Sequence, residues 1–85
     1  MKVKVRFFAS IKEAVGRDSE DLELPAGVAT VAALRAHLRS RGGAWAEALG
    51  ESKRVTAAVN QDMAKPAAAL NAGDEVAFFP PVTGG

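Results

Sequence analysis

The residues with the clearest capacity for chemistry are the last two, Gly84 and Gly85, which end in an α-carboxylate. Without Cβ atoms, such an end can enter a channel too narrow for any side chain. The carboxylate is ionised at neutral pH, with a reference pKa of about 3.3–3.7. It is a weak nucleophile, but it could attack the α-phosphorus of ATP to give an acyl-adenylate. An inert, frayed end would carry the same residues, so the pair indicates chemistry only together with what precedes it.

Side chains that could supply an active site are few. The chain contains no cysteine and a single histidine, His37. Thiolate nucleophiles, disulfides, thiolate metal sites and a histidine-based triad therefore lack their groups. We place His37 at the margin of the apolar stripe of a helix, as a boundary residue. The sequence thus predicts no metal site and no active site of its own.

Two further patterns resemble binding motifs but do not complete them. Gly42-Gly43 is not followed by the Gly-Lys-Ser/Thr of a phosphate loop. An acidic cluster lacks the spacing of an EF-hand, and we interpret it as a solvated strand edge. The cluster consists of Asp18, Glu20, Asp21 and Glu23.

Length and composition limit the class of protein. The chain has 85 residues, enough for one domain, with 48% hydrophobic and 25% charged residues. A net charge of +1 gives no electrostatic footprint for nucleic acid or an anionic membrane. Residues 1–5 alternate like a strand instead of forming a signal peptide, and no apolar run reaches the roughly 18–20 residues of a membrane span. We expect a cytoplasmic protein without nucleic-acid or membrane partners.

The element that would hold the terminus is a strand ending at Phe79. Residues 76–79 are apolar without interruption, which is typical of a strand buried between neighbours. Pro80 and Pro81 then end it, because neither can donate a ladder hydrogen bond. The sequence therefore predicts a folded domain of residues 1–81 and a flexible tail formed by Val82, Thr83, Gly84 and Gly85.

The rest of the chain predicts two strands, a helix and two more strands in succession before this last one. Thr30 is the expected N-cap of the main helix, and Ser10 to Glu13 has the spacing of a capping box, with Gly16 closing a short helical turn. Gly42-Gly43 should end the main helix. The predicted elements are strands at 2–9 and 20–24, the main helix at 31–41, further helical turns at 45–49, and strands at 55–59 and 63–64. This order favours an α+β fold in which one helix covers one face of a mixed sheet.

The stretch from Gly73 to Gly85, GDEVAFFPPVTGG, closely resembles the C-terminus of the MoaD-type ubiquitin-like sulfur carriers, the small subunits of molybdopterin synthase. The resemblance extends along the whole chain. It implies a β-grasp, or ubiquitin-like, fold in which the first and last strands are parallel central neighbours.

The resemblance also implies a function. An E1-like adenylyltransferase of the MoeB type would adenylate the Gly85 carboxylate with ATP and magnesium, and sulfur from a persulfide donor would displace AMP to leave a thiocarboxylate. The tail from Pro80 to Gly85 would then enter the large catalytic subunit, of the MoaE type, and give its sulfur to cyclic pyranopterin monophosphate. Two transfers make the dithiolene that binds molybdenum. The chain would bind no cofactor and would be non-catalytic on its own, within a complex of two small and two large subunits.

Strand alternation predicts where partners bind. Val76 and Phe78 should face the core, which leaves Phe79 on the open face beside Phe8 of the first strand. Met63 would widen this apolar surface. Contiguous apolar surface of this kind usually marks a binding site.

Three alternatives stay open on the sequence. A carrier for thiazole synthesis would use the same terminal chemistry, although FFPPV before the tail is not expected there. A ubiquitin-like modifier would form isopeptide bonds with lysines. A plain interaction domain would have an inert tail.

Overall fold

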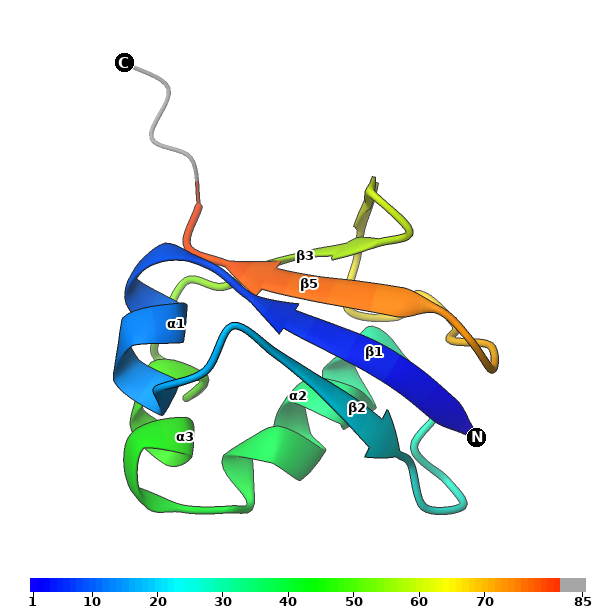
Figure 1. Cartoon of the computed structure of the whole chain (residues 1–85), viewed down its shortest axis with the longest axis horizontal. Coiled ribbons are helices and arrows are strands. Elements are labelled where there is room, and N and C mark those ends of the chain that lie inside the picture. Colours follow the sequence, from blue (N-terminus) through cyan, green and yellow to red (C-terminus); the bar gives the residue numbers. More distant parts are fainter. Residues whose placement is uncertain (82–85) are drawn as a thin grey trace.

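The computed structural model describes residues 1–81, and the predicted tail at 82–85 lies outside the described residues. Five strands form one mixed sheet, and three helices lie on one of its faces (Figure 1). The elements are β1 (Lys2–Phe7), α1 (Ala9–Val15), β2 (Ser19–Glu23), α2 (Val31–Arg39), α3 (Gly43–Ala48), β3 (Thr56–Val59), β4 (Asp62–Ala64) and β5 (Glu75–Phe79).

The strand order is β2-β1-β5-β3-β4, so the last strand of the chain lies at the centre of the sheet. It runs parallel to β1 and antiparallel to β3, while β2 and β4 pair antiparallel at the two edges. This is the β-grasp topology with parallel central first and last strands. The prediction of an α+β fold in which the main helix covers one face of a mixed sheet is confirmed, and α1 and α3 lie on the same face as α2.

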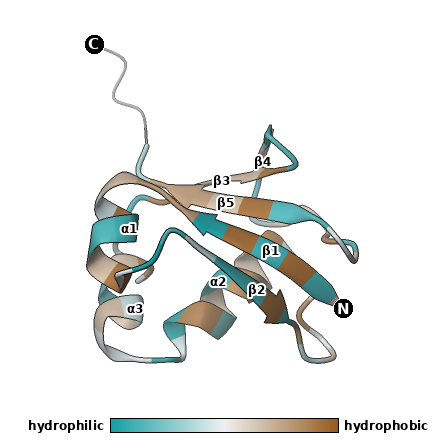
Figure 2. Ribbon diagram, in the orientation of Figure 1, coloured by the Kyte–Doolittle hydropathy of each residue, from teal (hydrophilic) through white to brown (hydrophobic). Residues whose placement is uncertain are grey.

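The core lies between the sheet and the helices. Val3, Val5 and Phe7 of β1 point into it, and Lys2, Lys4 and Arg6 point away, as the alternation predicted. Figure 2 shows this pattern as alternating hydrophobic and hydrophilic bands along β1. Other fully buried core side chains come from β5, α2 and the end of α3: Val76, Phe78, Leu34, Leu38 and Leu49.

Helix α2 begins where the sequence predicted and ends two residues earlier. The hydroxyl of Thr30 accepts a hydrogen bond from the backbone N–H of Ala33 at 3.1 Å, which confirms the N-cap. The last helical residue is Arg39 instead of Arg41. Gly42, with φ of 75°, then redirects the chain as the N-cap of α3. The glycine pair therefore separates two helices that both lie on the core.

The capping box predicted at Ser10 to Glu13 is wrong. The first strand ends at Phe7 instead of Ala9, and Phe8 is the N-cap of α1 with extended backbone angles and no side-chain cap. Ala9 has φ of 51°, so the chain turns into the helix immediately after the strand. Ser10 therefore lies inside the first turn of α1. Gly16, with φ of 75°, closes this helix as predicted, and its N–H donates to the carbonyl of Lys12.

The start of β5 is fixed by a small polar network. The Asn60 amide donates to the Asp74 carboxylate at 3.0 Å and accepts from the N–H of Glu75 at 3.0 Å. Asp74 also accepts from the N–H of Asn71 at 2.7 Å, and these bonds, Asn71 first, hold the pKa of the Asp74 carboxyl below its usual value. Asn60 and Gln61, both with positive φ, form the two-residue turn between β3 and β4. The same turn thus connects a hairpin and anchors the central strand.

Within residues 1–81, no helix is both long and apolar enough to cross a membrane.

Candidate functional site

The C-terminal end of β5 is the first part of the candidate site. Phe78 is fully buried, and the next residue, Phe79, is half-buried and faces the opposite side of the sheet. β5 is paired on both sides up to this point, with Phe7 opposite Phe78 and Thr56 opposite Phe79. Pro80 and the exposed Pro81 follow and have no strand structure, so the strand ends immediately before the two prolines, as predicted.

Phe8 lies beside Phe79 on the open face. The N–H of Phe8 donates to the carbonyl of Phe78 at 3.1 Å, which continues the parallel ladder one residue beyond the Phe7–Phe78 pair. In a parallel ladder this bond places Phe8 opposite Phe79. The φ and ψ of Phe8, −129° and 156°, are extended, so the alternation of β1 continues through it. Phe8 is 40% exposed, and its predicted position next to Phe79 is confirmed.

Met63 joins the same face through the strand register. Ala58 of β3 lies opposite Ala77 of β5 on one side and Met63 of β4 on the other. These three residues form a row that crosses the open face next to the Phe8–Phe79 pair. Met63 is 69% exposed, the most of any large hydrophobic side chain in residues 1–81. We call the surface formed by Phe8, Phe79, Ala77 and Met63, with the largely buried Ala58 between the last two, the open-face patch.

The half of the open face farther from Pro80 is charged. The register places Lys2 opposite Glu23 and Lys4 opposite Asp21. The N-terminal amine lies 2.8 Å from the Glu23 carboxylate and, as hydrogen-bond donor first and as a charge second, lowers the pKa of that carboxyl. The open face is therefore apolar at the end where the chain leaves β5 and charged at the other end.

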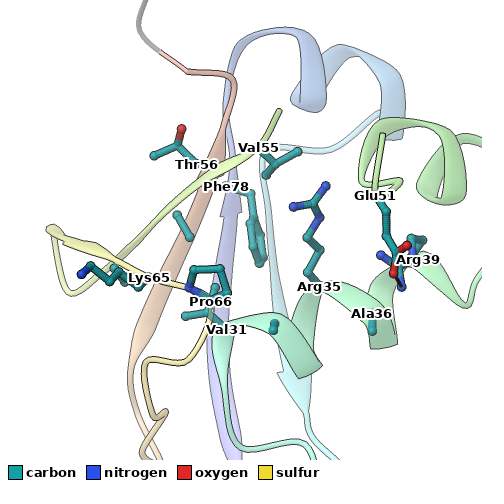
Figure 3. A pocket seen from close by; sticks show the side chains of 13 residues that line it. Val31, Arg35, Ala36, Arg39, Glu51, Val55, Thr56, Lys65, Pro66 and Phe78 are labelled. Atoms are coloured by element: carbon teal, nitrogen blue, oxygen red, sulfur yellow. Dashed lines mark hydrogen bonds and ion pairs between the residues drawn. The ribbon is translucent and has the colours of Figure 1, made fainter. Parts of the chain in front are cut away.

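A groove of about 530 Å³ lies on the other face of the sheet, between α2 and β3 (Figure 3). Its lining includes the apolar side chains of Phe78 and Ala57 and the charged side chains of Arg39, Glu51 and Lys65. Because Phe78 and Phe79 point to opposite sides of β5, this groove is separated from the open-face patch by the sheet.

Arg35 in this groove has a structural role that the sequence did not reveal. Figure 3 shows its side chain rising from α2 toward the start of β3. Its guanidinium donates to the carbonyls of Leu49, Gly50 and Lys53 at 2.8, 2.6 and 3.0 Å. Burial is the main cause that lowers the pKa of Arg35 from its usual value. Arg35 therefore ties the segment after α3 to α2.

The interpretation of the acidic cluster as a solvated strand edge holds for Asp18, Asp21 and Glu23, which are exposed, and is wrong for Glu20. Its carboxylate accepts hydrogen bonds from Arg41, at 2.5 and 2.9 Å, and from Arg17 at 2.8 Å, and its side chain is only 17% exposed. Both guanidinium groups also lie over the ring of Trp45, with Cζ 4.6 Å from the ring centroid for Arg41 and 5.8 Å for Arg17. The bond from Arg41 is the largest cause of a lowered pKa of Glu20, and it raises the pKa of Arg41 in turn. The contacts among Glu20, Arg41 and Trp45 therefore connect the edge strand β2 to the turn between α2 and α3 and to α3 itself.

Titratable residues do not assemble into a catalytic or metal centre in the part of the chain that the structure describes. No group of three histidine, cysteine, aspartate or glutamate side chains there could hold a metal ion. His37 is half-buried on α2, in agreement with the boundary position predicted for it. The groups predicted to react, at Gly84 and Gly85, and their neighbours Val82 and Thr83 lie outside the described residues. What residues 1–81 provide is a central strand that ends beside an apolar surface.

Comparison with known proteins places the chain in a family. The model of the ThiS family matches residues 5–85. A molybdopterin synthase sulfur carrier subunit from Escherichia coli (strain K12) is 49% identical over 83 residues, which cover 98% of this chain and 99% of the relative. A solved structure from Pyrococcus furiosus, described as subunit 1 of a molybdopterin converting factor, is 34% identical with a TM-score of 0.79 and covers 96% of this chain and 99% of its own. A solved complex of subunits 1 and 2 of the molybdopterin-converting factor from Helicobacter pylori contains a chain that is 29% identical with a TM-score of 0.68, both chains being covered in full. The family model, the full-length identity and the common fold agree, and the chain belongs to the ThiS family.

Proposed function

We propose that this chain is a sulfur carrier in molybdenum cofactor biosynthesis, the small and non-catalytic subunit of a molybdopterin synthase. The observation that carries the proposal is the position of β5, the central strand, which ends at Phe79 in the open-face patch and is followed in sequence by Pro80-Pro81 and, at the end of the chain, Gly84-Gly85. The Escherichia coli relative, named as a sulfur carrier subunit and matched over nearly its full length, supports the same role.

The chemistry takes place at the Gly85 carboxylate in active sites of other proteins. In an E1-like adenylyltransferase, a carboxylate oxygen attacks the α-phosphorus of ATP, held with magnesium, and pyrophosphate leaves. The outer sulfur of a persulfide then attacks the acyl carbon, and AMP leaves with the electron pair of the broken C–O bond. A thiol then attacks the donor's sulfur in the resulting acyl disulfide, so that the thiocarboxylate leaves and a new disulfide joins the thiol to the donor. Adenylation is needed because a carboxylate oxygen is a poor leaving group and AMP is a good one.

The thiocarboxylate acts after docking to the large catalytic subunit. We infer that the open-face patch is the docking surface and that residues 80–85 reach into the partner's active site, where the sulfur passes to cyclic pyranopterin monophosphate. The Helicobacter pylori complex of subunits 1 and 2 supports a partner of this kind. Two small and two large subunits would form the working complex in the cytoplasm.

The test is the intact mass of the protein purified from its native host. The sulfur-carrier proposal requires a species heavier than the sequence mass by the difference between one sulfur and one oxygen atom. A variant lacking Gly85, and one with an extra residue after Gly85, should not form molybdopterin, although their thermal stability should match the wild type. An extended variant that makes molybdopterin at the normal rate would contradict the proposal.

The mass, together with two further readouts, separates the alternative functions. A ubiquitin-like modifier would yield covalent adducts on lysines of other proteins in the lysate. A carrier for thiazole synthesis would form the thiocarboxylate but would not restore molybdopterin formation with the large subunit. An interaction domain with an inert tail would show the unmodified mass and no effect of removing Gly85.

A further inference from the structure

Arg6 is the cation that borders the open-face patch on β1. Its neighbours across the sheet are Ser19 on β2 and Ala77 on β5, both uncharged. The two lysines of β1 differ in this respect, because the register places a carboxylate of β2 directly opposite each of them. Arg6 therefore places a positive charge in the apolar half of the open face, and neither residue directly opposite it carries a carboxylate.

The contacts of Arg6 hold the guanidinium beside the patch. Its Cζ lies over the ring of Phe8, 5.3 Å from the ring centroid, a geometry in which the planar guanidinium can stack and still direct N–H groups outward. The carboxylate nearest to Arg6 belongs to Glu75, which lies diagonally across from it on β5. The distance from Arg6 Nη1 to Glu75 Oε2 is 4.0 Å, and the side chains of Arg6 and Glu75 are 45% and 32% exposed. A pair so long and so exposed is largely screened by solvent and contributes little.

Docking on the patch would change the surroundings of this charge. A protein that covers Phe8 and Phe79 must also exclude water from much of Arg6, which stacks on one of them. Removing an arginine from water without a close anion is unfavourable, whereas a carboxylate in bidentate contact offsets the loss of hydration. The distant contact to Glu75 does not provide such an anion.

We propose that Arg6 is a specificity-determining residue of the docking surface, and that the partner covering the open-face patch places an aspartate or glutamate carboxylate against its guanidinium. The inference rests on the proposed function, because it takes the large subunit as that partner. Arg6 would select, among proteins with an apolar docking site, those that also present a negative charge at this edge. Phe8 then has two roles, as part of the patch and as the support that orients Arg6.

The test is the affinity of the full-length chain for the large subunit, measured by calorimetry at low and high salt. Arg6→Gln should weaken binding about tenfold or more, and Arg6→Glu further, because each change leaves the covered carboxylate of the partner without its cation. The loss should shrink as salt increases. Lys4→Gln is the matched control, because Lys4 is on the same strand and face but lies opposite Asp21, and it should change affinity less than about twofold. Thermal unfolding of each variant checks that the fold is kept.

Phe79→Ala, measured in parallel, separates this inference from the proposed function. If Phe79→Ala weakens binding while Arg6→Gln binds as tightly as the wild type, the open-face patch is the docking surface and the inference about Arg6 is overturned. An unchanged affinity of Phe79→Ala overturns the docking surface, and the role of Arg6 with it. Equal losses for Arg6→Gln and Lys4→Gln would also overturn it, because a general positive field would then explain both.

Discussion

Phe78 and Phe79 are adjacent in sequence, and we predict that replacing them has opposite effects. Phe78 is fully buried between the sheet and the helices and lies opposite Phe7 and Ala57 in the register. Phe79 is half-buried on the other face, next to Phe8. Phe78→Ala should therefore destabilise the fold, and Phe79→Ala should weaken the complex with the large subunit while the fold remains.

The magnitudes follow from burial. Emptying a fully buried phenylalanine site costs about 3–5 kcal/mol, whereas a domain of 85 residues has a total stability of roughly 4–13 kcal/mol. Phe78→Ala thus removes a large part of the stability and can unfold the chain, so Phe78→Leu, which keeps more of the apolar volume and leaves a smaller cavity, is the milder variant. Phe79→Ala should reduce stability by less than about 1 kcal/mol but reduce affinity at least tenfold, or about 1.4 kcal/mol.

Denaturant unfolding and calorimetric titration with the large subunit provide the two readouts. At about 4–8 °C per kcal/mol for a domain of this size, Phe78→Leu should lower the melting temperature measurably and leave affinity unchanged. The opposite pattern, in which Phe79→Ala unfolds the domain and Phe78→Leu only loosens the complex, would refute the assigned faces of β5. Equal affinity of Phe79→Ala and wild type would refute the docking surface instead.

Three further predictions concern the fold. Glu20→Gln should cost about 1–2 kcal/mol at pH 7. Because the folded pKa of Glu20 is lowered, this contribution is fully present above the unfolded value of about 4.3 and is lost as the pH falls through the folded pKa. The difference between the unfolding curves of the two proteins should therefore shrink as the pH is lowered from 7 into the acid range, and a difference that stays constant would contradict the assigned ion pair. Arg35→Met should destabilise the fold by about 1.5–3 kcal/mol, because its hydrogen bonds to the three carbonyls are lost, and should leave the affinity for the large subunit unchanged. A large loss of affinity would indicate that the partner docks on the groove face instead of the open face. Thr30→Ala should cost about 1 kcal/mol and Thr30→Ser much less; equal melting temperatures for all three proteins would show that the cap does not contribute.

Strand alternation was predictable because it depends on neighbouring residues alone. The burial of Val76 and Phe78, and the exposure of Phe8, followed from parity once the strands were recognised. The Thr30 cap was recognisable for the same reason, since its donor is only three residues away. The predicted boundaries failed where the fold turned the chain earlier than local preference suggested, as at Ala9.

The roles of Arg35 and Glu20 could not be predicted, because their partners are distant in sequence. The three carbonyls that Arg35 contacts belong to residues 14 to 18 positions later, and backbone acceptors leave no trace in the side-chain pattern. Glu20 finds Arg41 across 21 positions, while the sequence places it among exposed acidic residues. For the reacting end of the chain, the prediction rests on Gly84-Gly85 and the resemblance, since the described residues stop at Pro81.

The central position of β5 also determines how the domain would respond to force. A partner that holds the tail, or a machine that pulls on it, loads β5 along its own axis. β1 and β5 are parallel neighbours, so the start of β1 at Lys2 and the end of β5 at Phe79 lie at opposite ends of the pair. Tension between these ends shears the ladder, and the load is shared among all its hydrogen bonds instead of opening them one by one. The domain should therefore resist extraction through its C-terminus far better than a domain whose last strand lies at the edge of its sheet.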